Sequence, residues 1–531
     1  MLLGPDISKS IVSKKVEPRF DAPRASNGKP MNKILSQVPS IRIRSSGRTS
    51  PDSNGKYVLY WMSAHRRLTH NFALQRSVDW SLHLSQPLVI LEPLRCGYRW
   101  ACERFHQFIL DGMAEHAKEM ASIPAATYYP YVEPQRGHQD GLLDHLATSA
   151  SVIVTDDFPV FFHPAMIRSI SRRHERFWEI VDSNGIIPMR QFDRTFTVAH
   201  SFRRAHQKWF RQEWPVFPEP APLNRLPKGK AIELPDSVKK RWSPLQFGRD
   251  GTPKIDLSKL PIDHEIREGF TSGGTAVAQQ RLKGFVERKL SNYANDRNEP
   301  QQEGSSGLSA HLHFGHISSH EVFLALFEGT EWSPELLGKA EGKMEGFWNL
   351  SPNADPLLDQ LITWREIGFN FAARERNYDQ YESLPEWAQQ TLAEHADDPR
   401  PAIYSLEEFT QAKTHDPLWN AAQRQLVREG RIHNYLRMLW GKKILHWTRS
   451  PQEALEVMIQ LNNQFALDGR DPNSYSGIFW VLGRYDRAWG PERPVFGKIR
   501  YMTSESTASK WRVGEYIKKY SDAATCLKPR P

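Results

Sequence analysis

Short apolar runs alternate with long amphipathic stretches through the N-terminal part of the chain. The apolar runs have the length and composition of buried strands and lie at 57–62, 87–94 and 151–158. The amphipathic stretches have helical periodicity and lie at about 65–84, 98–120 and 160–180. Strand alternating with helix predicts an α/β domain with a doubly wound parallel sheet, which we place at 56–200. No GxGxxG motif follows the first strand, and any ligand is expected at the carboxyl ends of the strands.

The pattern changes after this domain. Proline-rich sequence such as "WPVFPEPAPLNRLP" predicts an interdomain linker over 201–262. From 263 to 515 the periodicity is helical, which predicts an all-α domain. Residues 1–55 are polar and basic and are expected to form a disordered tail, and 516–531 form a second polar tail. A chain of 531 residues is long enough for two such domains.

The helical part contains "LLDQLITWREIGFNF" at 357–371, a predicted helix with polar residues among apolar ones. On an α-helix, Gln360 and Trp364 are four residues apart and share a face. That face is either an ordinary half-buried surface or the floor of a site where an amide and an indole hold a ligand.

Composition narrows the function. A net charge of +9 favours a polyanionic partner, nucleic acid first, although a basic tail alone would also produce it. The 17 Trp residues indicate aromatic platforms or a large flat cofactor as well as core packing. No apolar run reaches the roughly 18–20 residues of a membrane span, and we expect no secretory signal. Cys96, Cys102 and Cys526 form no CxxC pair, so no structural zinc or iron–sulfur cluster is expected.

The segment "GLSAHLHFGHIS" (307–318) could hold an anion. Gly307 and Ser309 precede a helix, where hydroxyls and backbone amides bind phosphate; a plain helix cap is the equal alternative. The three His residues of this segment have no carboxylate or Cys pattern beside them, and we expect no metal.

Tryptophans recur at helical spacing in 416–447. Trp440 and Trp447 are seven residues apart, two helical turns, and Trp419 lies on the preceding segment. Such a stripe is ordinarily core, but it could also conduct electrons stepwise to a buried redox cofactor. Arg437 lies one turn before Trp440 and could place a cation beside that cofactor.

Charged residues cluster in two further segments. In "LNNQFALDGRDPNSYSGIFW" (461–480), Asp468 and Asp471 mark a turn, for which helix caps are the simpler explanation. Because a buried charge needs a partner, we predict an ion pair between Asp468 and Arg437. In "RYDRAWGPERPVFGKIRYM" (484–502), basic residues alternate with aromatic ones, which suits either a nucleic-acid surface or a solvated loop.

Together these segments resemble the DNA photolyase and cryptochrome superfamily, specifically the class II cyclobutane pyrimidine dimer (CPD) photolyases. The resemblance is clearest in "HDPLWNA", "RMLWGKKILHW", "LDGRDPNSYSG" and "ERPVFGKIRYM", and "LHFGHIS" and "YWMSAHRRLTHNFAL" support it. It extends in register from about 57 to 502. It implies an α/β antenna domain, a helical domain that holds FAD, and light-driven splitting of pyrimidine dimers in UV-damaged DNA.

The resemblance also implies roles for individual residues. The implied FAD-binding residues are Tyr293, Arg297, Ser305, Ser306, Gly307, Leu308, Ser309, Arg437, Asp468 and Asp471. The implied electron path is Trp440, Trp419 and Trp447. The implied catalytic residues are Asn462, facing the flavin, and Gln360, Trp364 and Trp480 at the lesion. The implied DNA contacts are Arg484, Arg487, Arg493, Lys498 and Arg500. We expect a monomer, cytoplasmic or, in a eukaryote, nuclear, with an antenna chromophore of the deazaflavin type.

The chain departs from the family pattern at the lesion. CPD photolyases usually have Glu at the position of Gln360, and Gln there is similar to enzymes that repair the 6-4 photoproduct. A one-residue shift of register would instead give the role to Asp359. The loop "WVLGRYDRAW" is one residue shorter and lacks the family's His, and "LSAHLHFG" has Ala-His where Pro-Tyr is common. A blue-light photoreceptor without repair is the rival function, although Trp364, Trp480 and the basic 484–500 stretch favour a lesion pocket.

Overall fold

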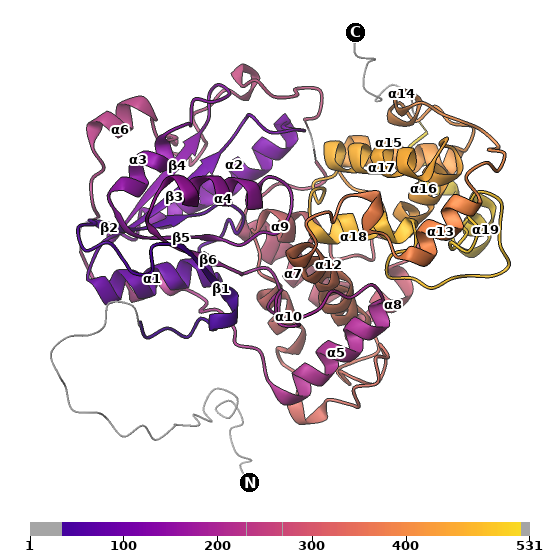
Figure 1. Ribbon diagram of the computed structural model, residues 1–531, viewed down its shortest axis with the longest axis horizontal. Helices are drawn as coiled ribbons and strands as arrows, with labels where there is room; N and C mark the ends of the chain where they lie inside the picture. The colour runs from indigo at the N-terminus through magenta and orange to yellow at the C-terminus, as the bar shows by residue number, and fades with distance from the viewer. Residues whose placement is uncertain (1–33, 230, 268, 522–531) are drawn as a thin grey trace, which may run out of the picture.

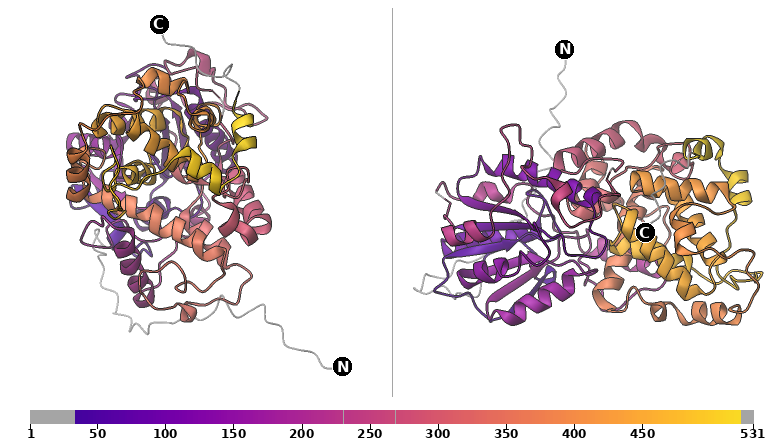
Figure 2. Two further views of the ribbon diagram at one scale, coloured as in Figure 1. Left: turned by 90° about the vertical axis from the view of Figure 1, so that its right-hand side faces the viewer. Right: turned by 90° about the horizontal axis from the view of Figure 1, so that it is seen from above.

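The computed structural model describes residues 34–229, 231–267 and 269–521. An α/β domain lies beside a helical domain, and Figure 1 shows the first in indigo to magenta and the second in brown to yellow. The same division is clear from above in Figure 2. No described helix is both long and apolar enough to cross a membrane.

The α/β domain is built on a six-stranded sheet. Its strands are β1 (Ile43–Gly47), β2 (Tyr57–Trp61), β3 (Leu88–Leu94), β4 (Ala126–Val132), β5 (Ala150–Asp156) and β6 (Phe177–Val181). The spatial order is β1-β6-β5-β2-β3-β4, with every neighbouring pair parallel except β1 and β6. The three predicted strands are confirmed as β2, β3 and β5. β6 lies in the stretch 160–180, which was predicted to be helical, so that prediction holds only for its first part.

Helices cover both faces of the sheet. They are α1 (Phe72–Leu84), α2 (Glu103–Met120), α3 (Leu142–Thr148) and α4 (His163–Arg173). Along β2, Val58 and Tyr60 belong to the hydrophobic cluster under α1, whereas Leu59 and Trp61 belong to the cluster under α3 and α4. This alternation places the two clusters on opposite faces and explains why the central strands have no polar side.

The predicted disordered tail over 1–55 is wrong for its described part, residues 34–55. β1 lies there and pairs antiparallel with β6. Arg42, only 2% exposed, donates hydrogen bonds to the carbonyl oxygens of Asp182, Gly185 and Ile186. Backbone pairing and one buried guanidinium hold this segment in place. Its hydropathy pattern therefore did not predict that it is ordered. Residues 1–33 lie outside the described residues.

The predicted linker over 201–262 contains two helices, α5 (Ala199–Gln212) and α6 (Asp236–Arg241). Phe202, His206, Trp209 and Phe210 are buried, and their spacing places them on one face of α5. Figure 1 shows α5, in magenta, beneath the helical domain, so part of the predicted linker belongs to that domain.

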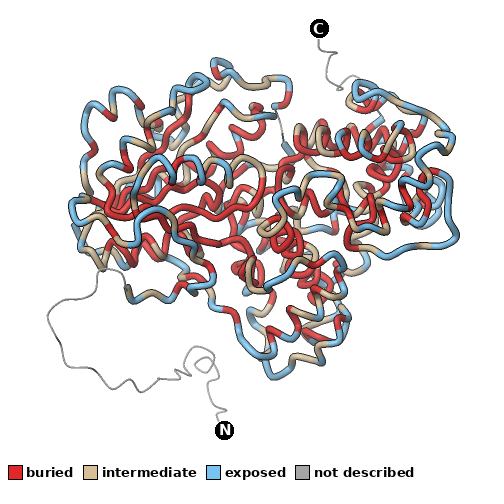
Figure 3. The backbone as a smooth tube through the Cα atoms, viewed as in Figure 1, coloured by how far each residue is buried: buried red, intermediate tan, exposed pale blue. Residues whose placement is uncertain are grey.

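The C-terminal half is all helical, as predicted. Its helices are α7 (Thr275–Arg288), α8 (Tyr293–Asp296), α9 (Ser309–Phe314), α10 (Ser319–Phe327), α11 (Ala354–Leu358), α12 (Arg365–Arg374), α13 (Glu386–Glu394), α14 (Leu406–Thr410), α15 (Pro417–Glu429), α16 (Asn434–His446), α17 (Pro451–Phe465), α18 (Pro472–Val481), α19 (Ser504–Lys510) and α20 (Gly514–Lys519). Buried backbone, red in Figure 3, runs through the sheet and through α15, α16 and α17.

The predicted tail over 516–531 is also wrong where it is described. Tyr516 and Tyr520, within and just after α20, are buried against α15. Their hydroxyls donate hydrogen bonds of 2.7 Å to Gln425 and Glu429. Two tyrosines therefore fix a segment that is otherwise polar, and 522–531 lie outside the described residues.

Candidate active site

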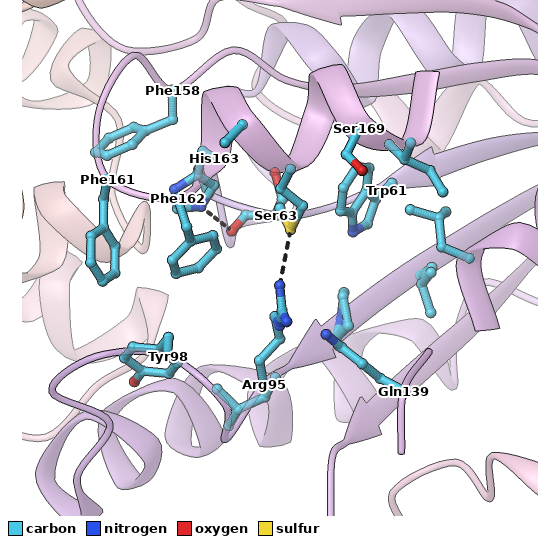
Figure 4. Close-up of a pocket in the computed structure, with 18 of the residues that line it drawn as sticks. Trp61, Ser63, Arg95, Tyr98, Gln139, Phe158, Phe161, Phe162, His163 and Ser169 are labelled. Atoms are coloured by element: carbon cyan, nitrogen blue, oxygen red, sulfur yellow. Dashed lines mark hydrogen bonds between the residues drawn. The ribbon is translucent and has the colours of Figure 1, made fainter. Parts of the chain in front are cut away.

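A cavity of about 510 Å³ opens at the carboxyl ends of β2, β3 and β5. Phe158, Phe161 and Phe162 form one wall, and Arg95 and Gln139 enter from the opposite side (Figure 4). These strands are neighbours at the point where the chain order of the sheet reverses, which is where doubly wound domains bind ligands. The cavity therefore lies where the sequence predicted a ligand.

Unsatisfied polar atoms face this cavity. Ser63 Oγ and His163 Nδ1 are buried and have no hydrogen-bond partner among the described residues. Burial lowers the pKa of His163 to about 4, so its ring is neutral near pH 7. His313 and Arg470 of the helical domain complete the lining. The cavity thus lies between the two domains and offers both apolar walls and free polar groups.

The predicted ion pair between Arg437 and Asp468 is confirmed. Arg437 Nη2 donates to Asp468 Oδ1 at 3.0 Å, and Nη1 donates to Oδ2 at 3.3 Å. The two side chains are 24% and 16% exposed, although α16 and the end of α17 are largely buried. The pair is therefore partly accessible to solvent and is not sealed in the packed core.

Asp471 joins three elements of the helical domain. Its carboxylate caps α18 at the Asn473 N–H, and it contacts Arg365 at 3.1 Å and His313 at 3.4 Å. Burial acts to raise the pKa of Asp471, but Arg365 and His313 hold it below its ordinary value. Asn462, also buried, donates a hydrogen bond of 2.6 Å to Ser474 Oγ on the same helix α18.

The predicted phosphate turn exposes its hydroxyls. Ser305 and Ser309 are exposed, Ser306 is half-buried, and Leu308 anchors the turn in the core. Gly307 has φ of +68°, a left-handed backbone conformation that favours glycine. On the preceding helix, the Arg297 guanidinium lies 5.5 Å from the ring of buried Tyr293.

The three tryptophans of the predicted electron path lie close together in the core of the helical domain. Trp419 Nε1 donates to the Trp440 carbonyl oxygen at 3.0 Å, and the ring centroids of Trp419 and Trp447 are 6.0 Å apart. Trp440 Nε1 donates to Gln423 at 2.8 Å. All three rings are buried, and Tyr404 lies beyond Trp447 with ring centroids 5.6 Å apart. The rings of Trp419 and Trp447 are neighbours, and Trp419 bonds the backbone of Trp440; electron transfer along the three residues stays a prediction.

The α-helix expected over 357–371 is interrupted by a π-helical turn, η6 (Asp359–Trp364). π-Turns inside α-helices are frequent at functional sites. Asp359 is buried, and its carboxylate has partners inside the protein. Arg203 binds both carboxylate oxygens, and Trp364 Nε1 donates to Oδ2 at 3.1 Å. The alternative in which Asp359 faces a lesion is therefore wrong. Gln360 is partly exposed, and its amide has no hydrogen-bond partner in the part of the chain that the structure describes.

Trp480 is the second half-buried indole, and it packs against the same hydrophobic cluster as Trp364. Trp364 directly precedes α12, and Trp480 lies on α18. These two helices approach so closely that a Cβ on Gly368 would lie 2.4 Å from Ser476 Oγ. The Lys442 ammonium lies 4.9 Å from the Trp480 ring centroid, a cation–π distance. Lys442 therefore contacts the Trp480 indole from α16.

Of the five predicted DNA contacts, Arg484 is wrong. It is 1% exposed, with its guanidinium 3.7 Å from the Phe479 ring and 4.0 Å from the Phe371 ring. Arg487, Arg493 and Lys498 are exposed. The fifth residue, Arg500, is half-buried and binds Asp486 at 2.8 Å. Lys498 is also paired, with Glu492 at 3.2 Å. The basic surface therefore consists of exposed Arg487 and Arg493 and two cations that already have carboxylate partners, Lys498 and Arg500.

Lys442 supports a pH prediction. Burial lowers the pKa of its ammonium to about 7, against an ordinary value of 10.5. Between these two pH values the unfolded chain holds the proton and the folded chain does not, so this group makes the free energy of unfolding rise with pH. Lys442→Met should therefore flatten the pH dependence of urea unfolding across this window, whereas the exposed Lys510→Met should not. Equal slopes in Lys442→Met and the unchanged protein would contradict the assignment.

Sequence reasoning missed Arg203 and Lys442. Arg203 lies in the segment that was predicted as linker, and no local pattern marked Lys442 as buried. The signal for Arg203 was the apolar spacing of α5, which predicts a buried face beside it. Among the described residues, no group of His, Cys, Asp and Glu is arranged to hold a metal.

Comparison with known proteins places the chain. It is 31% identical to the deoxyribodipyrimidine photo-lyase of Methanothermobacter thermautotrophicus over 484 residues, which cover 90% of this chain and 98% of the relative. It is 32% identical to the Arabidopsis thaliana enzyme of the same name over 500 residues, 91% of this chain and 92% of the relative. No family model matches the chain.

Among solved structures, a bacterial class III photolyase from Agrobacterium tumefaciens superimposes with a TM-score of 0.59 and 16% identity, covering 88% of this chain and 87% of that one. This likeness concerns the fold. With the sequence relationship over nearly the whole length of both chains, it leads to one conclusion: the chain belongs to the deoxyribodipyrimidine photo-lyase family.

Proposed function

We propose that this protein repairs cyclobutane pyrimidine dimers in UV-damaged DNA, using light and bound FAD. The observation that carries the proposal is the group of buried tryptophans Trp440, Trp419 and Trp447, which begins one helical turn from the Arg437–Asp468 pair. Tryptophans placed in this way beside a partly exposed ion pair suit electron transfer to a bound flavin. The long match to relatives named deoxyribodipyrimidine photo-lyase supports the same function.

The residues present fit FAD. The Arg437–Asp468 pair is partly exposed, so it can contact a flavin ring edge. The exposed hydroxyls of Ser305 and Ser309, with the backbone amides around Gly307, suit a pyrophosphate. Arg365 Nε is buried and has no partner among the described residues, which leaves a donor beside Asp471. When bound, FAD supplies the light-driven electron transfer.

The lesion would lie between the two half-buried indoles. A dimer distorts the duplex and costs less to unstack than intact bases, and Trp364 and Trp480 would stack against it once it is flipped out. The free amide of Gln360 can donate to a thymine carbonyl oxygen and accept from a ring N–H. The exposed Arg487, Arg493 and Lys498 would neutralise phosphates.

The cavity of the α/β domain would hold an antenna chromophore. Three phenylalanines give it flat apolar walls, and Ser63 and His163 offer unsatisfied polar atoms to a ligand. A planar chromophore of the deazaflavin type suits this lining. His313 contacts both the cavity and Asp471, so the two ligands would be separated by few side chains.

Binding in the dark tests the proposal at Gln360. The protein should bind an oligonucleotide with one CPD about tenfold or more tightly than the undamaged sequence or one with a 6-4 photoproduct, a difference of about 1.4 kcal/mol. Gln360→Glu preserves side-chain length and removes the donor, so it should change affinity for the CPD and leave affinity for undamaged DNA unaltered. Preference for the 6-4 photoproduct would contradict the proposed substrate.

A further inference from the structure

One side of η6 is attached to α5. Arg203 Nε donates to Asp359 Oδ1 at 2.6 Å, and Nη2 donates to Oδ2 at 3.0 Å. One turn further along α5, His206 Nε2 lies 2.9 Å from Thr363 Oγ1. Burial lowers the pKa of His206 to about 3, so this contact is a neutral hydrogen bond. Two successive turns of α5 therefore hold both ends of η6.

The ion pair extends directly to Trp364. Asp359 Oδ2 accepts from both Arg203 Nη2 and Trp364 Nε1, so one oxygen joins the guanidinium to the indole. The side chains of Arg203 and Asp359 are 13% and 5% exposed, which shields their interaction from water. Bidentate pairs of this kind fix direction as well as distance. The orientation of the indole is therefore set from α5.

The π-geometry explains why this support is needed. In a π-turn the backbone hydrogen bonds join residues five apart, and Asp359 and Trp364 have this spacing. Such turns are rare in comparison with α-helix. Bonds from Arg203 to Asp359 and from His206 to Thr363 stabilise this one. With Asp359 directed to α5, the adjacent Gln360 lies on a different side of the turn and keeps its amide free.

We infer that Arg203 and Asp359 are positioning residues for the damaged-base site. Their ion pair orients Trp364 and holds η6 so that Gln360 points away from α5, and it thereby sets the preference for damaged over undamaged DNA. Neither residue contacts DNA in this arrangement. The inference rests on the proposed function and adds to it that α5, a helix outside the lesion site itself, determines lesion selectivity.

The test measures lesion preference in the dark, as the ratio of dissociation constants for undamaged and CPD oligonucleotides. Arg203→Met and Asp359→Asn should each lower this ratio about tenfold, since small displacements of positioning groups have effects of this order or greater. The double variant should lower it no further than Arg203→Met alone, because both changes break the same ion pair and only Arg203→Met also removes the 3.2 Å bond from Arg203 Nη1 to the Gly342 carbonyl oxygen. Arg211→Met is the matched control: Arg211 lies on the same helix and, among the described residues, its side chain bonds only the Gly338 carbonyl oxygen, at 3.3 Å. It should leave the ratio unchanged.

A second measurement separates positioning from general support of the fold. The ¹⁵N–¹H resonance of the Trp364 indole, identified with Trp364→Phe, should shift in Asp359→Asn and return towards its original position in Asp359→Glu. Loss of stability with an unchanged binding ratio and an unchanged resonance would overturn the inference. If Arg203→Met does not fold, Arg203→Lys, which keeps the charge and loses the bidentate geometry, should show a smaller fall in the ratio. An unchanged ratio there would overturn it as well.

The outcomes distinguish this inference from the function on which it rests. If the unchanged protein binds both oligonucleotides equally, the proposed substrate is wrong and the inference falls with it. If the unchanged protein prefers the CPD and the Arg203 and Asp359 variants keep that preference, only the inference is overturned.

Discussion

Trp440→Phe should slow the light-driven reduction of bound FAD by about tenfold or more, which corresponds to about 1.4 kcal/mol or more of added barrier. A phenyl ring is much harder to oxidise than an indole, and Trp440 is the member of the chain that lies on α16 with Arg437. The substitution also removes the hydrogen bond from Trp440 Nε1 to Gln423. The measurement is the bleaching of oxidised flavin absorbance under blue light with an external reductant present.

Trp511→Phe is the control for this experiment. Trp511 is half-buried against the same hydrophobic cluster but contacts Tyr435 instead of the path. It should photoreduce at the rate of the unchanged protein. Photoreduction at an unchanged rate in Trp440→Phe would show that electrons reach the flavin by another route.

Arg437→Leu should weaken FAD binding by about 10- to 100-fold, or about 1.4–2.8 kcal/mol. The change leaves the Asp468 carboxylate without its partner at 3.0 Å, and an unpaired, partly buried carboxylate at the binding site is unfavourable. The effect should be smaller than for a fully buried pair, because water reaches both groups. Titration of the FAD-free protein with FAD measures the dissociation constant.

A surface ion pair supplies the comparison. Arg449 binds Glu453 at 3.1 Å, and the Arg449 side chain is 70% exposed, so Arg449→Leu should not alter FAD affinity. If Arg437→Leu binds FAD as tightly as Arg449→Leu does, the flavin does not bind at the Arg437–Asp468 pair.

Hydropathy predicted most of the fold because its elements depend on apolar spacing. β2, β3 and β5 and the helices around them follow from that pattern. The segments that were predicted wrongly are held by polar groups: β1 by backbone pairing and Arg42, and α20 by tyrosine hydroxyls. Such contacts join residues far apart in sequence, so no local pattern reveals them.

The candidate site also contains features that the sequence predicted and features that depend on contacts between distant residues. The Arg437–Asp468 pair followed from the rule that a buried charge needs a partner, and the structure bears it out. The π-turn could not be predicted from the sequence, because Gln360 and Trp364 have ordinary helical spacing. The partner of Asp359, Arg203, lies over 150 residues away on α5. Arg484 was misplaced because a basic residue beside aromatics has the same sequence pattern whether it is stacked in the core or exposed.

Repair itself is the most direct test of the account. The purified protein, with its flavin photoreduced, is mixed with an oligonucleotide carrying one CPD and exposed to blue light, while a second sample stays in the dark. Chromatography of the oligonucleotide should show the dimer converted to intact pyrimidines in the light only, and an oligonucleotide carrying a 6-4 photoproduct should remain unchanged. A CPD that persists under blue light in protein whose flavin is fully reduced would contradict the proposed function.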